Sequence, residues 1–173
     1  MDKPVFLKDK KKYFIELSFK LGIIVVLIIA DIATKVYFAN RHAQRLGDMT
    51  VIPRILSFTY TRNTGAAFGI FGNSTLFLTI ASAVFIIGFF VADMFFHNKN
   101  GWYVASFTLI VGGAIGNFID RAFLGYVRDF IRFDFINFAI FNLADVFLTI
   151  GLICYCIWIL FFVGKKDKVV TKK

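Results

Sequence analysis

The stretch 125-GYVRDFIRFDFINFAIFNLAD-145 carries two aspartates, Asp129 and Asp145, that lie sixteen residues apart. We expect Asp129 to lie in a loop. Asp145 is expected within an apolar run, from about 138 to 163, that is long enough to cross a membrane. An ionisable side chain is costly inside a membrane, so its presence there indicates a function. The stretch therefore predicts a membrane-spanning helix with a candidate functional site at its start.

The composition indicates a membrane protein with several spans. The chain has 173 residues, of which 58% are hydrophobic and 24 are phenylalanine, and its mean hydropathy is +0.73. This length leaves room for about four spans of ~20 residues with their connections. The net charge of +9 does not indicate a nucleic-acid partner, because the basic residues lie at the ends of apolar runs and form no patch with aromatic residues.

The apolar runs predict a single membrane domain over residues 1–173. The first run, 13–39, is too long for a secretory signal peptide and carries Asp31 and Lys35 on one helical face, so we expect it to remain as a span. Further spans are expected at 74–96, from about 102 to 121, and at about 138–163. The basic segments 1–12 and 164–173 are expected to be cytoplasmic tails.

Residues 40–73 differ from the spans and are expected to form a β segment on the outer face. Leu56, Phe58 and Tyr60 alternate with polar residues, as in a half-buried strand, and Val51 with Ile52 can supply a shorter partner. The predicted fold class is therefore an all-α integral membrane protein, a four-transmembrane-helix bundle with a small β-sheet on the outer face.

Two pairs of residues in the spans have structural interpretations. Gly112 and Gly116 form a pair of small residues that lets another helix approach closely. Asp93 and His97 lie one turn apart at the end of their span, next to a polar turn, where we expect water to reach them.

The basic residues predict the orientation of the chain in the membrane. Four spans place both termini on one side, and that side holds 12 of the 20 basic residues, which indicates that both termini are cytoplasmic. All seven arginines fall on the other, outer side. Because an arginine fork suits phosphates and peptide carbonyls, this outer surface is expected to contact lipid headgroups or a peptide.

The polar residues of the spans gather near the outer interface, and Asp145 is expected ~10 Å below the start of its helix. A transporter usually places its site near the midplane, between repeats with broken helices, and the sequence shows neither feature. The position favours chemistry on a membrane-anchored substrate. The alternative is a small four-helix transporter or lipid-binding membrane protein, in which the aspartates would bind a cation or a headgroup.

The residue types on the outer side favour acid–base chemistry by carboxylates. His42 is the only outer histidine and no cysteine lies there, so a zinc site or a cysteine nucleophile lacks parts. Two aspartates that share a water remain, since one of two close carboxyl groups keeps its proton. Of six outer aspartates, Asp145 is the strongest candidate, with Asn142 one turn before it to orient it. Asp120 and Asp134 are expected in ion pairs.

Four motifs then suggest a family. NTGAAFG at 63–69, GGAIGNFIDR at 112–121, GYVRDF at 125–130 and FNLAD at 141–145 together resemble the prolipoprotein signal peptidases, signal peptidase type II. The resemblance implies an intramembrane aspartic endopeptidase of the bacterial cell membrane, active at the outer face as a monomer among phospholipids. It would remove the signal peptide from diacylglyceryl-modified prolipoproteins by cutting before the lipidated cysteine, with no metal or cofactor.

The resemblance also assigns roles to residues. It implies that Asp129 and Asp145 are the catalytic pair. The residues that it implies to orient them or bind substrate are Asp31, Asn63, Gly65, Asn117, Arg121 and Asn142. The family's first motif usually reads Asp-Gln-x-x-Lys, whereas this chain has Ile32 in place of the glutamine. Lys35 is expected to pair with Asp31, the segment 40–73 to clamp the substrate along the membrane surface, and the loop with Asp129 to gate entry.

Overall fold

The structure is a computed structural model that describes residues 7, 9–65 and 74–163. Its helices are α2 (Lys10–Ala43), α3 (Thr75–Phe96), α4 (Gly101–Leu124) and α5 (Leu143–Phe162). Its strands are β1 (Met49–Ile52), β2 (Leu56–Asn63) and β3 (Val127–Phe133). In the described ranges, all four of these helices are long and apolar enough to cross a membrane. The predicted four-helix membrane fold with a small sheet is confirmed.

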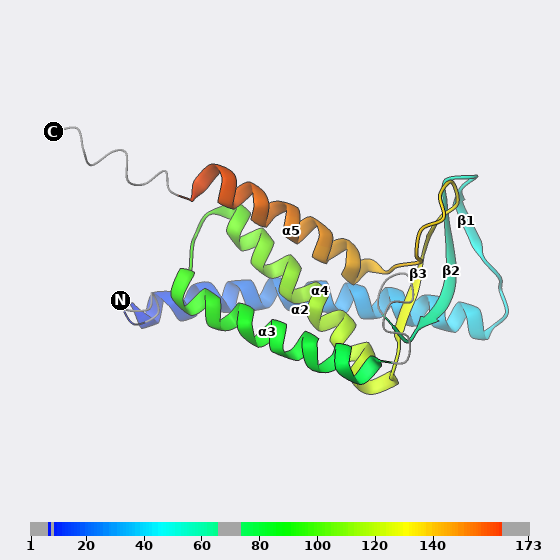
Figure 1. The fold of residues 1–173 in the computed structure, drawn as a ribbon, viewed down its shortest axis with the longest axis horizontal. Coiled ribbons are helices and arrows are strands. Elements are labelled where there is room, and N and C mark those ends of the chain that lie inside the picture. The colour runs from blue at the N-terminus through cyan, green and yellow to red at the C-terminus, as the bar shows by residue number, and fades with distance from the viewer. Residues whose placement is uncertain (1–6, 8, 66–73, 164–173) are drawn as a thin grey trace.

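Helix α4 is the centre of the bundle, and the other three helices pack against it (Figure 1). Small residues make these contacts close. A Cβ atom on Gly113 would collide with the backbone oxygen of Ala144 in α5, and one on Gly116 would collide with the carboxylate of Asp31 in α2. The predicted role of Gly112 and Gly116 in close helix packing is therefore confirmed, and their neighbour is α2.

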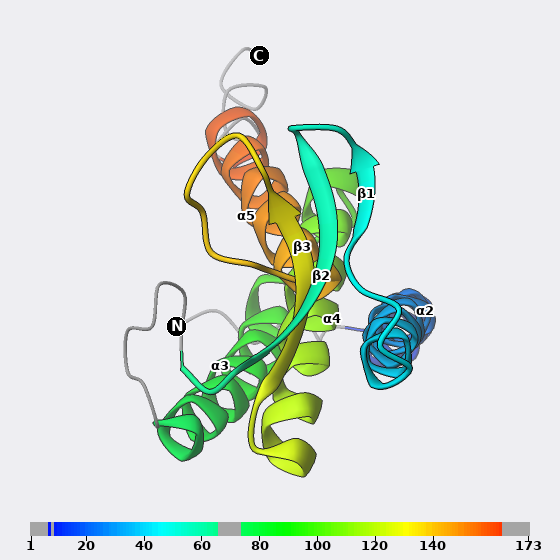
Figure 2. The same cartoon turned by 90° about the vertical axis from the view of Figure 1, so that its right-hand side faces the viewer.

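The three strands form an antiparallel sheet in the order β1-β2-β3 across one end of the bundle (Figures 1 and 2). We call this the sheet end, and the end where α2 begins and α5 finishes the far end. In the sheet, Thr61 of β2 lies opposite Asp129 of β3, and Asn63 lies opposite Val127. The prediction that Asp129 lies in a loop was wrong. The charged Asp129 interrupts the alternation of apolar residues that would have identified β3 in the sequence. The strand is held by its pairing with β2.

Helix α5 begins at Leu143, later than predicted, because other interactions hold the residues before it. The backbone of Phe141 accepts hydrogen bonds from the N–H groups of Phe130 and Ile131, and donates one to Ile131. Asn142 then caps the helix through a capping box with Asp145. Asp145 therefore lies in the first turn of α5, and the predicted depth of ~10 Å below the helix start was wrong.

A buried ionic cluster joins three helices at the far end. Lys20 of α2 lies 2.5 Å from Asp93 of α3, and the hydroxyl of Tyr103 in α4 donates to the same carboxylate over 2.8 Å. His97 contacts Asp93 and Glu16. The expectation that water reaches Asp93 was wrong, because Lys20 and Tyr103 cover it and its side chain is fully buried.

Helix α3 depends on this cluster, since Asp93 is its one buried residue. Replacing Asp93 with Asn leaves the ammonium group of Lys20 buried without its counter-charge. We expect a loss of ~3–5 kcal/mol of stability, measured by unfolding in detergent micelles. As a control, Asp48→Asn removes only an exposed pair with Arg132, and we expect it to cost less than ~1 kcal/mol. Equal losses would show that the buried pair does not hold α3.

Candidate active site

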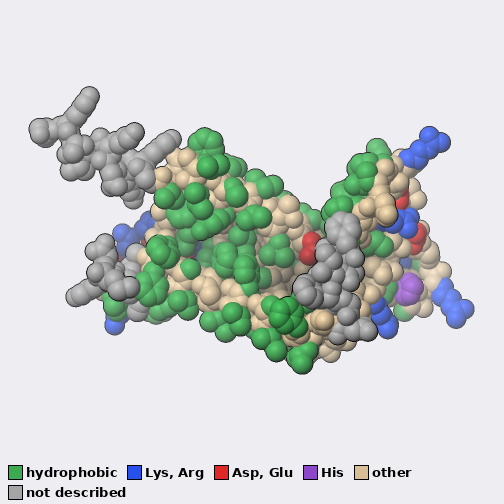
Figure 3. Space-filling view, in the orientation of Figure 1, with side chains coloured by type: hydrophobic (Ala, Val, Ile, Leu, Met, Phe, Trp, Pro, Cys, Tyr) green, Lys and Arg blue, Asp and Glu red, His purple; other side chains and the backbone are tan. Residues whose placement is uncertain are grey.

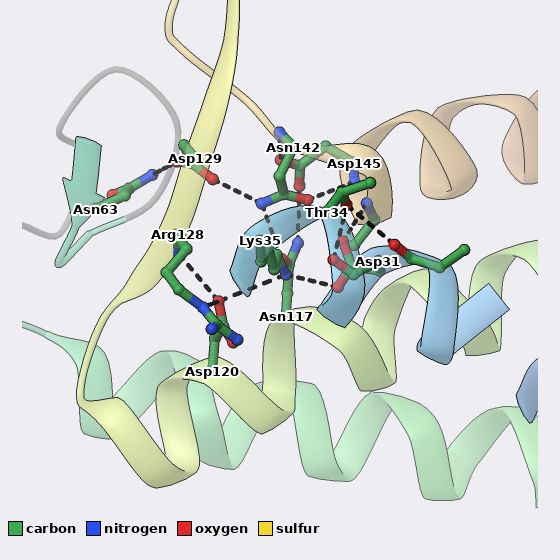
Figure 4. A network of polar contacts seen from close by, with 12 residues as sticks. Asp31, Thr34, Lys35, Asn63, Asn117, Asp120, Arg128, Asp129, Asn142 and Asp145 are labelled. Atoms are coloured by element: carbon green, nitrogen blue, oxygen red, sulfur yellow. Dashed lines mark hydrogen bonds and ion pairs between the residues drawn. The ribbon is translucent and has the colours of Figure 1, made fainter. Parts of the chain in front are cut away.

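A cavity of about 430 Å³ lies at the sheet end, between the sheet and the ends of α4 and α5. Asp129 and Asp145 both line it, together with Asn63, Asn117 and Arg121. Figure 4 shows the two aspartates on either side of Asn142. The rest of the lining is mostly apolar and includes Phe133, Phe138, Phe141 and Ile150. The cavity therefore combines two carboxylates with an apolar wall.

Asp129 is positioned by strand β3 and by two side-chain amides. Its Oδ2 accepts a hydrogen bond from Nδ2 of Asn63 over 2.9 Å, and its Oδ1 accepts one from Nδ2 of Asn142 over 2.6 Å. Asn63 is the last residue of β2, and Asn142 is the residue that caps α5. The end of a strand and the start of a helix therefore each provide one amide that donates to Asp129. Asp129 is only 2% exposed.

Asp145 is positioned by the start of α5. Its Oδ2 accepts from the backbone N–H of Asn142 over 3.1 Å, which is half of the capping box. Its Oδ1 accepts from Nδ2 of Asn117 in α4 over 2.8 Å. The predicted contact between Asn142 and Asp145 is present, although Asn142 makes it as the helix cap and not from within the helix.

The three asparagines are oriented by groups that can only donate. The oxygen of Asn63 accepts from the N–H of Gly65 over 3.0 Å. The oxygen of Asn117 accepts from the ammonium group of Lys35 over 2.9 Å, and that of Asn142 accepts from the N–H of Asp145 over 3.1 Å. Because each amide oxygen is engaged in this way, each amide NH₂ group faces a carboxylate or another amide oxygen.

Lys35 is fully buried beneath the site. Its Nζ atom lies 2.8 Å from Asp31 and 3.6 Å from Asp120. The other oxygen of Asp31 accepts from the N–H of Ala144 over 2.9 Å, which ties α2 to the start of α5. The predicted pair between Lys35 and Asp31 is confirmed. Its further contact with Asn117 was not predicted, although a lysine inside an apolar run could have pointed to it.

Asp120 and Asp134 form ion pairs, as expected, and do not line the cavity. Asp120 binds Arg128, with Nη2 at 2.6 Å from Oδ1, and so fastens β3 to the end of α4. Arg121, the residue that follows Asp120 in the sequence, does not make this pair. Asp134 lies near the surface, where it accepts hydrogen bonds from Ser57 and Arg132.

Arg121 is the cation that lines the cavity. Its Nε atom is buried and makes no hydrogen bond within the described residues. A guanidinium group in this state has donors available for a ligand in the cavity. The eight residues named from the sequence either line this cavity or are connected by hydrogen bonds or ion pairs to residues that line it.

The environment of Asp129 favours its protonated form. Burial and the neighbouring charge of Asp145 raise the pKa of Asp129 to about 6. They outweigh the hydrogen bonds from Asn63 and Asn142, which lower it. Asp129 thus keeps its proton to a higher pH than an ordinary carboxyl group does. Among the described residues, no group of three or more His, Cys, Asp or Glu side chains is placed to hold a metal ion.

The fold and the cavity define a class, a membrane protein with four helices that can span a membrane and two aspartates in one cavity under a small sheet. Residues 23–161 match the family model of signal peptidase (SPase) II, so the chain belongs to the signal peptidase II family and is a protease of the bacterial membrane.

Individual proteins agree with this assignment. The chain is 45% identical over 139 residues to a lipoprotein signal peptidase of Streptococcus agalactiae, covering 79% of this chain and 89% of that protein. It is 41% identical over 146 residues to a lipoprotein signal peptidase of Lactobacillus johnsonii, covering 83% and 92%. A solved bacterial membrane enzyme matches with a TM-score of 0.76 at 33% identity, covering 87% of this chain and 93% of that one.

The raised pKa of Asp129 predicts a pH-dependent stability. The folded state holds this proton up to pH about 6, whereas an ordinary carboxyl group releases it near 3.8. The stability that the proton contributes is present below pH about 4 and is lost as the pH rises through about 6. Relative to Asp129→Asn, the wild type should lose on the order of 3 kcal/mol across this range, measured by unfolding at several pH values.

Asp134→Asn is the matched control for this measurement. Hydrogen bonds from Ser57 and Arg132 lower the pKa of Asp134, so its contribution is lost as the pH falls. The two variants should therefore deviate from the wild type with opposite pH dependence. A difference for Asp129→Asn that is constant with pH would show that the folded protein does not hold the proton.

Proposed function

We propose that the chain is an aspartic endopeptidase that removes the signal peptide from diacylglyceryl-modified prolipoproteins by cutting before the lipidated cysteine. The observation that carries this proposal is the pair of carboxylates, Asp129 and Asp145, that face one cavity and are linked through Asn142. Family membership supports a prolipoprotein substrate. The aspartic mechanism rests on the residues themselves.

In the proposed mechanism the two carboxyl groups divide the work. Asp145, as the carboxylate, takes a proton from a water molecule that attacks the scissile carbonyl carbon. Asp129, whose pKa is raised, donates its proton to the carbonyl oxygen. The tetrahedral intermediate then collapses: Asp145 gives its proton to the leaving amine, the peptide C–N bond breaks, and one hydroxyl of the diol returns its proton to Asp129. Arg121 donates hydrogen bonds to the substrate backbone.

The asparagines support this division of work. They donate to both carboxylates, which keeps each aspartate in a fixed rotamer facing the cavity. Phe133, Phe138 and Phe141 supply the apolar wall against which the diacylglyceryl group would lie. In the described residues, the strand β2 of the segment 40–73 pairs with β3, which is consistent with its proposed role as a clamp on substrate at the membrane surface.

We place the sheet end at the outer face, with both termini in the cytoplasm and the chain acting as one monomeric domain among phospholipids. The support is the charge distribution, because all seven arginines belong to segments at the sheet end, while Lys20 and Lys99 lie at the far end. The middle of the bundle is apolar, with Ile24, Phe107 and Val111 at its core. This core favours a protease at the interface over a transporter with a site at the midplane.

The direct test is cleavage of a purified diacylglyceryl prolipoprotein in detergent or lipid. Asp129→Asn and Asp145→Asn should each lower the rate by ~10²-fold or more, because each removes an acid–base group. Asp134→Asn, which changes an aspartate outside the cavity, should cut at the wild-type rate. Undiminished cleavage by either of the first two variants would remove that residue from the mechanism.

Substitutions of Asn142 separate its two roles. Asn142→Ser retains a side chain that caps helices well, but it loses the amide that donates to Asp129 and Asn117. We expect stability within ~1 kcal/mol of the wild type and a kcat lowered by ~10-fold or more with little change in KM. Asn142→Ala removes the cap as well and should lower both stability and kcat. If the serine variant cleaves normally, the amide does not position the dyad.

A further inference from the structure

A pocket of about 480 Å³ lies at the far end, where the start of α2 meets the turn between α3 and α4. Its lining includes Ile15 and Phe19 of α2, Lys99 of the turn and Val104 of α4. Among the described residues that line it, none also lines the cavity with the two aspartates. The pocket is therefore a candidate binding site separate from the candidate active site.

The polar rim of this pocket has an excess of ammonium groups. We define the rim as residues 9–16 and 97–100, which hold the lysines Lys10, Lys11, Lys12 and Lys99 and the acidic residues Asp9 and Glu16. Apart from His97, four positive charges against two negative ones leave a net charge of +2. Figure 3 shows basic side chains at this end of the molecule. Such a rim attracts an anion.

The two carboxylates of the rim already have partners. Asp9 caps α2 by accepting a hydrogen bond from the backbone N–H of Lys12. Glu16 contacts both Lys99 and His97. Neither carboxylate is therefore left to neutralise the remaining lysines of the rim.

Lys12 and Lys99 are the two lysines that can contact one anion together. Lys12 lies beside Lys99. Lys99 is 60% exposed, and its ammonium group has donors left after its contact with Glu16. Neighbouring ammonium groups repel each other, and an anion that contacts both removes this repulsion. A phosphate group suits this place, because it has several acceptor oxygens and lysine binds it as a point charge.

Next to these lysines, one stripe of α2 is apolar and faces outward. Steps of three and four residues along a helix stay on one face, and from Lys12 they lead through Ile15, Phe19, Gly22 and Val26. The three apolar side chains of this stripe are between 62% and 67% exposed. A Cβ atom on Gly22 would meet nothing within 4 Å, so the stripe is notched there. An acyl chain can lie along this surface.

We propose that the pocket and the stripe together bind one phospholipid with an anionic headgroup. Its phosphate contacts Lys12 and Lys99, and an acyl chain lies along Phe19 and over the notch at Gly22. Charge selects this class of lipid, because basic pockets beside membrane helices bind acidic headgroups. A zwitterionic headgroup would bring its own ammonium group against the two lysines.

The length of the stripe fits this occupant. From Lys12 to Val26 the helix rises ~21 Å at 1.5 Å per residue. One leaflet of a bilayer with its headgroups is ~20–22 Å thick, which is half of the whole. The stripe therefore reaches from the headgroups to the ends of the acyl chains. The bound lipid would join the start of α2 to the turn between α3 and α4, at the end opposite the candidate active site.

Native mass spectrometry of the purified full chain tests the headgroup site. The anionic probe is phosphatidylglycerol, and the zwitterionic one is phosphatidylcholine with the same acyl chains. We expect the wild type to bind one phosphatidylglycerol at least ~10-fold more tightly than phosphatidylcholine, and the double variant Lys12→Gln, Lys99→Gln to lose this preference.

The matched control is the double variant Lys10→Gln, Lys11→Gln. It removes the same charge from the same turn of α2, at positions outside the lining of the pocket. It should keep most of the preference, because salt screens exposed charges that do not contact the headgroup. Equal binding of the two lipids by the wild type would overturn the proposal. An equal loss in both double variants would do the same, since it would show attraction to the whole surface and no site.

A second pair of variants tests the place of the acyl chain. Gly22→Leu fills the notch, whereas Gly88→Leu adds the same side chain at an equally open position on α3. Neither change meets a neighbouring atom with its Cβ, and both replace glycine with a better helix former, so both variants should fold. We expect the affinity for phosphatidylglycerol to fall ~3-fold or more in Gly22→Leu, through lost packing, and to stay unchanged in Gly88→Leu. An unchanged affinity in Gly22→Leu, or the same fall in both, would overturn the proposed position of the lipid.

Discussion

The ammonium group of Lys35 is the interaction on which the site depends. It is fully buried and contacts Asp31, Asp120 and Asn117. Removing it would leave the buried carboxylate of Asp31 without its cation, at a cost of several kcal/mol. The same group orients the amide of Asn117 towards Asp145. One side chain of α2 therefore neutralises the charges under the site and sets the direction of its hydrogen bonds.

The bundle is held by ions at both ends and by apolar packing between them. At the sheet end, Asp31 ties α2 to the start of α5, and Asp120 ties α4 to β3. At the far end, Asp93, which is the one buried residue of α3, pairs with Lys20 of α2. Moving an apolar side chain from lipid to a helix–helix contact changes its free energy little, because both surroundings are apolar. Buried ion pairs can therefore specify which helices contact each other and in what register.

Features that are local in the sequence were predicted correctly, and features that depend on distant segments were not. Long apolar runs predicted the four helices, because a membrane requires that length and composition. Alternation predicted β2, but β3 was missed because Asp129 stands where an apolar residue would face inward. The start of α5 was misplaced, since the backbone of Phe141 pairs with β3 instead of extending the helix. Water access to Asp93 was wrongly predicted, because its partner Lys20 lies 73 residues away.

The sequence by itself determined the class of fold and the family, because hydrophobic length and the motif match are local properties of the chain. Only the tertiary structure decided how the residues of the site work together. It placed Asp129 on a strand and Asp145 in the first turn of a helix, and it showed that every amide between them is oriented by an obligate donor. The physical reason is that hydrogen-bond direction and burial arise between segments distant in sequence, so no single stretch contains them.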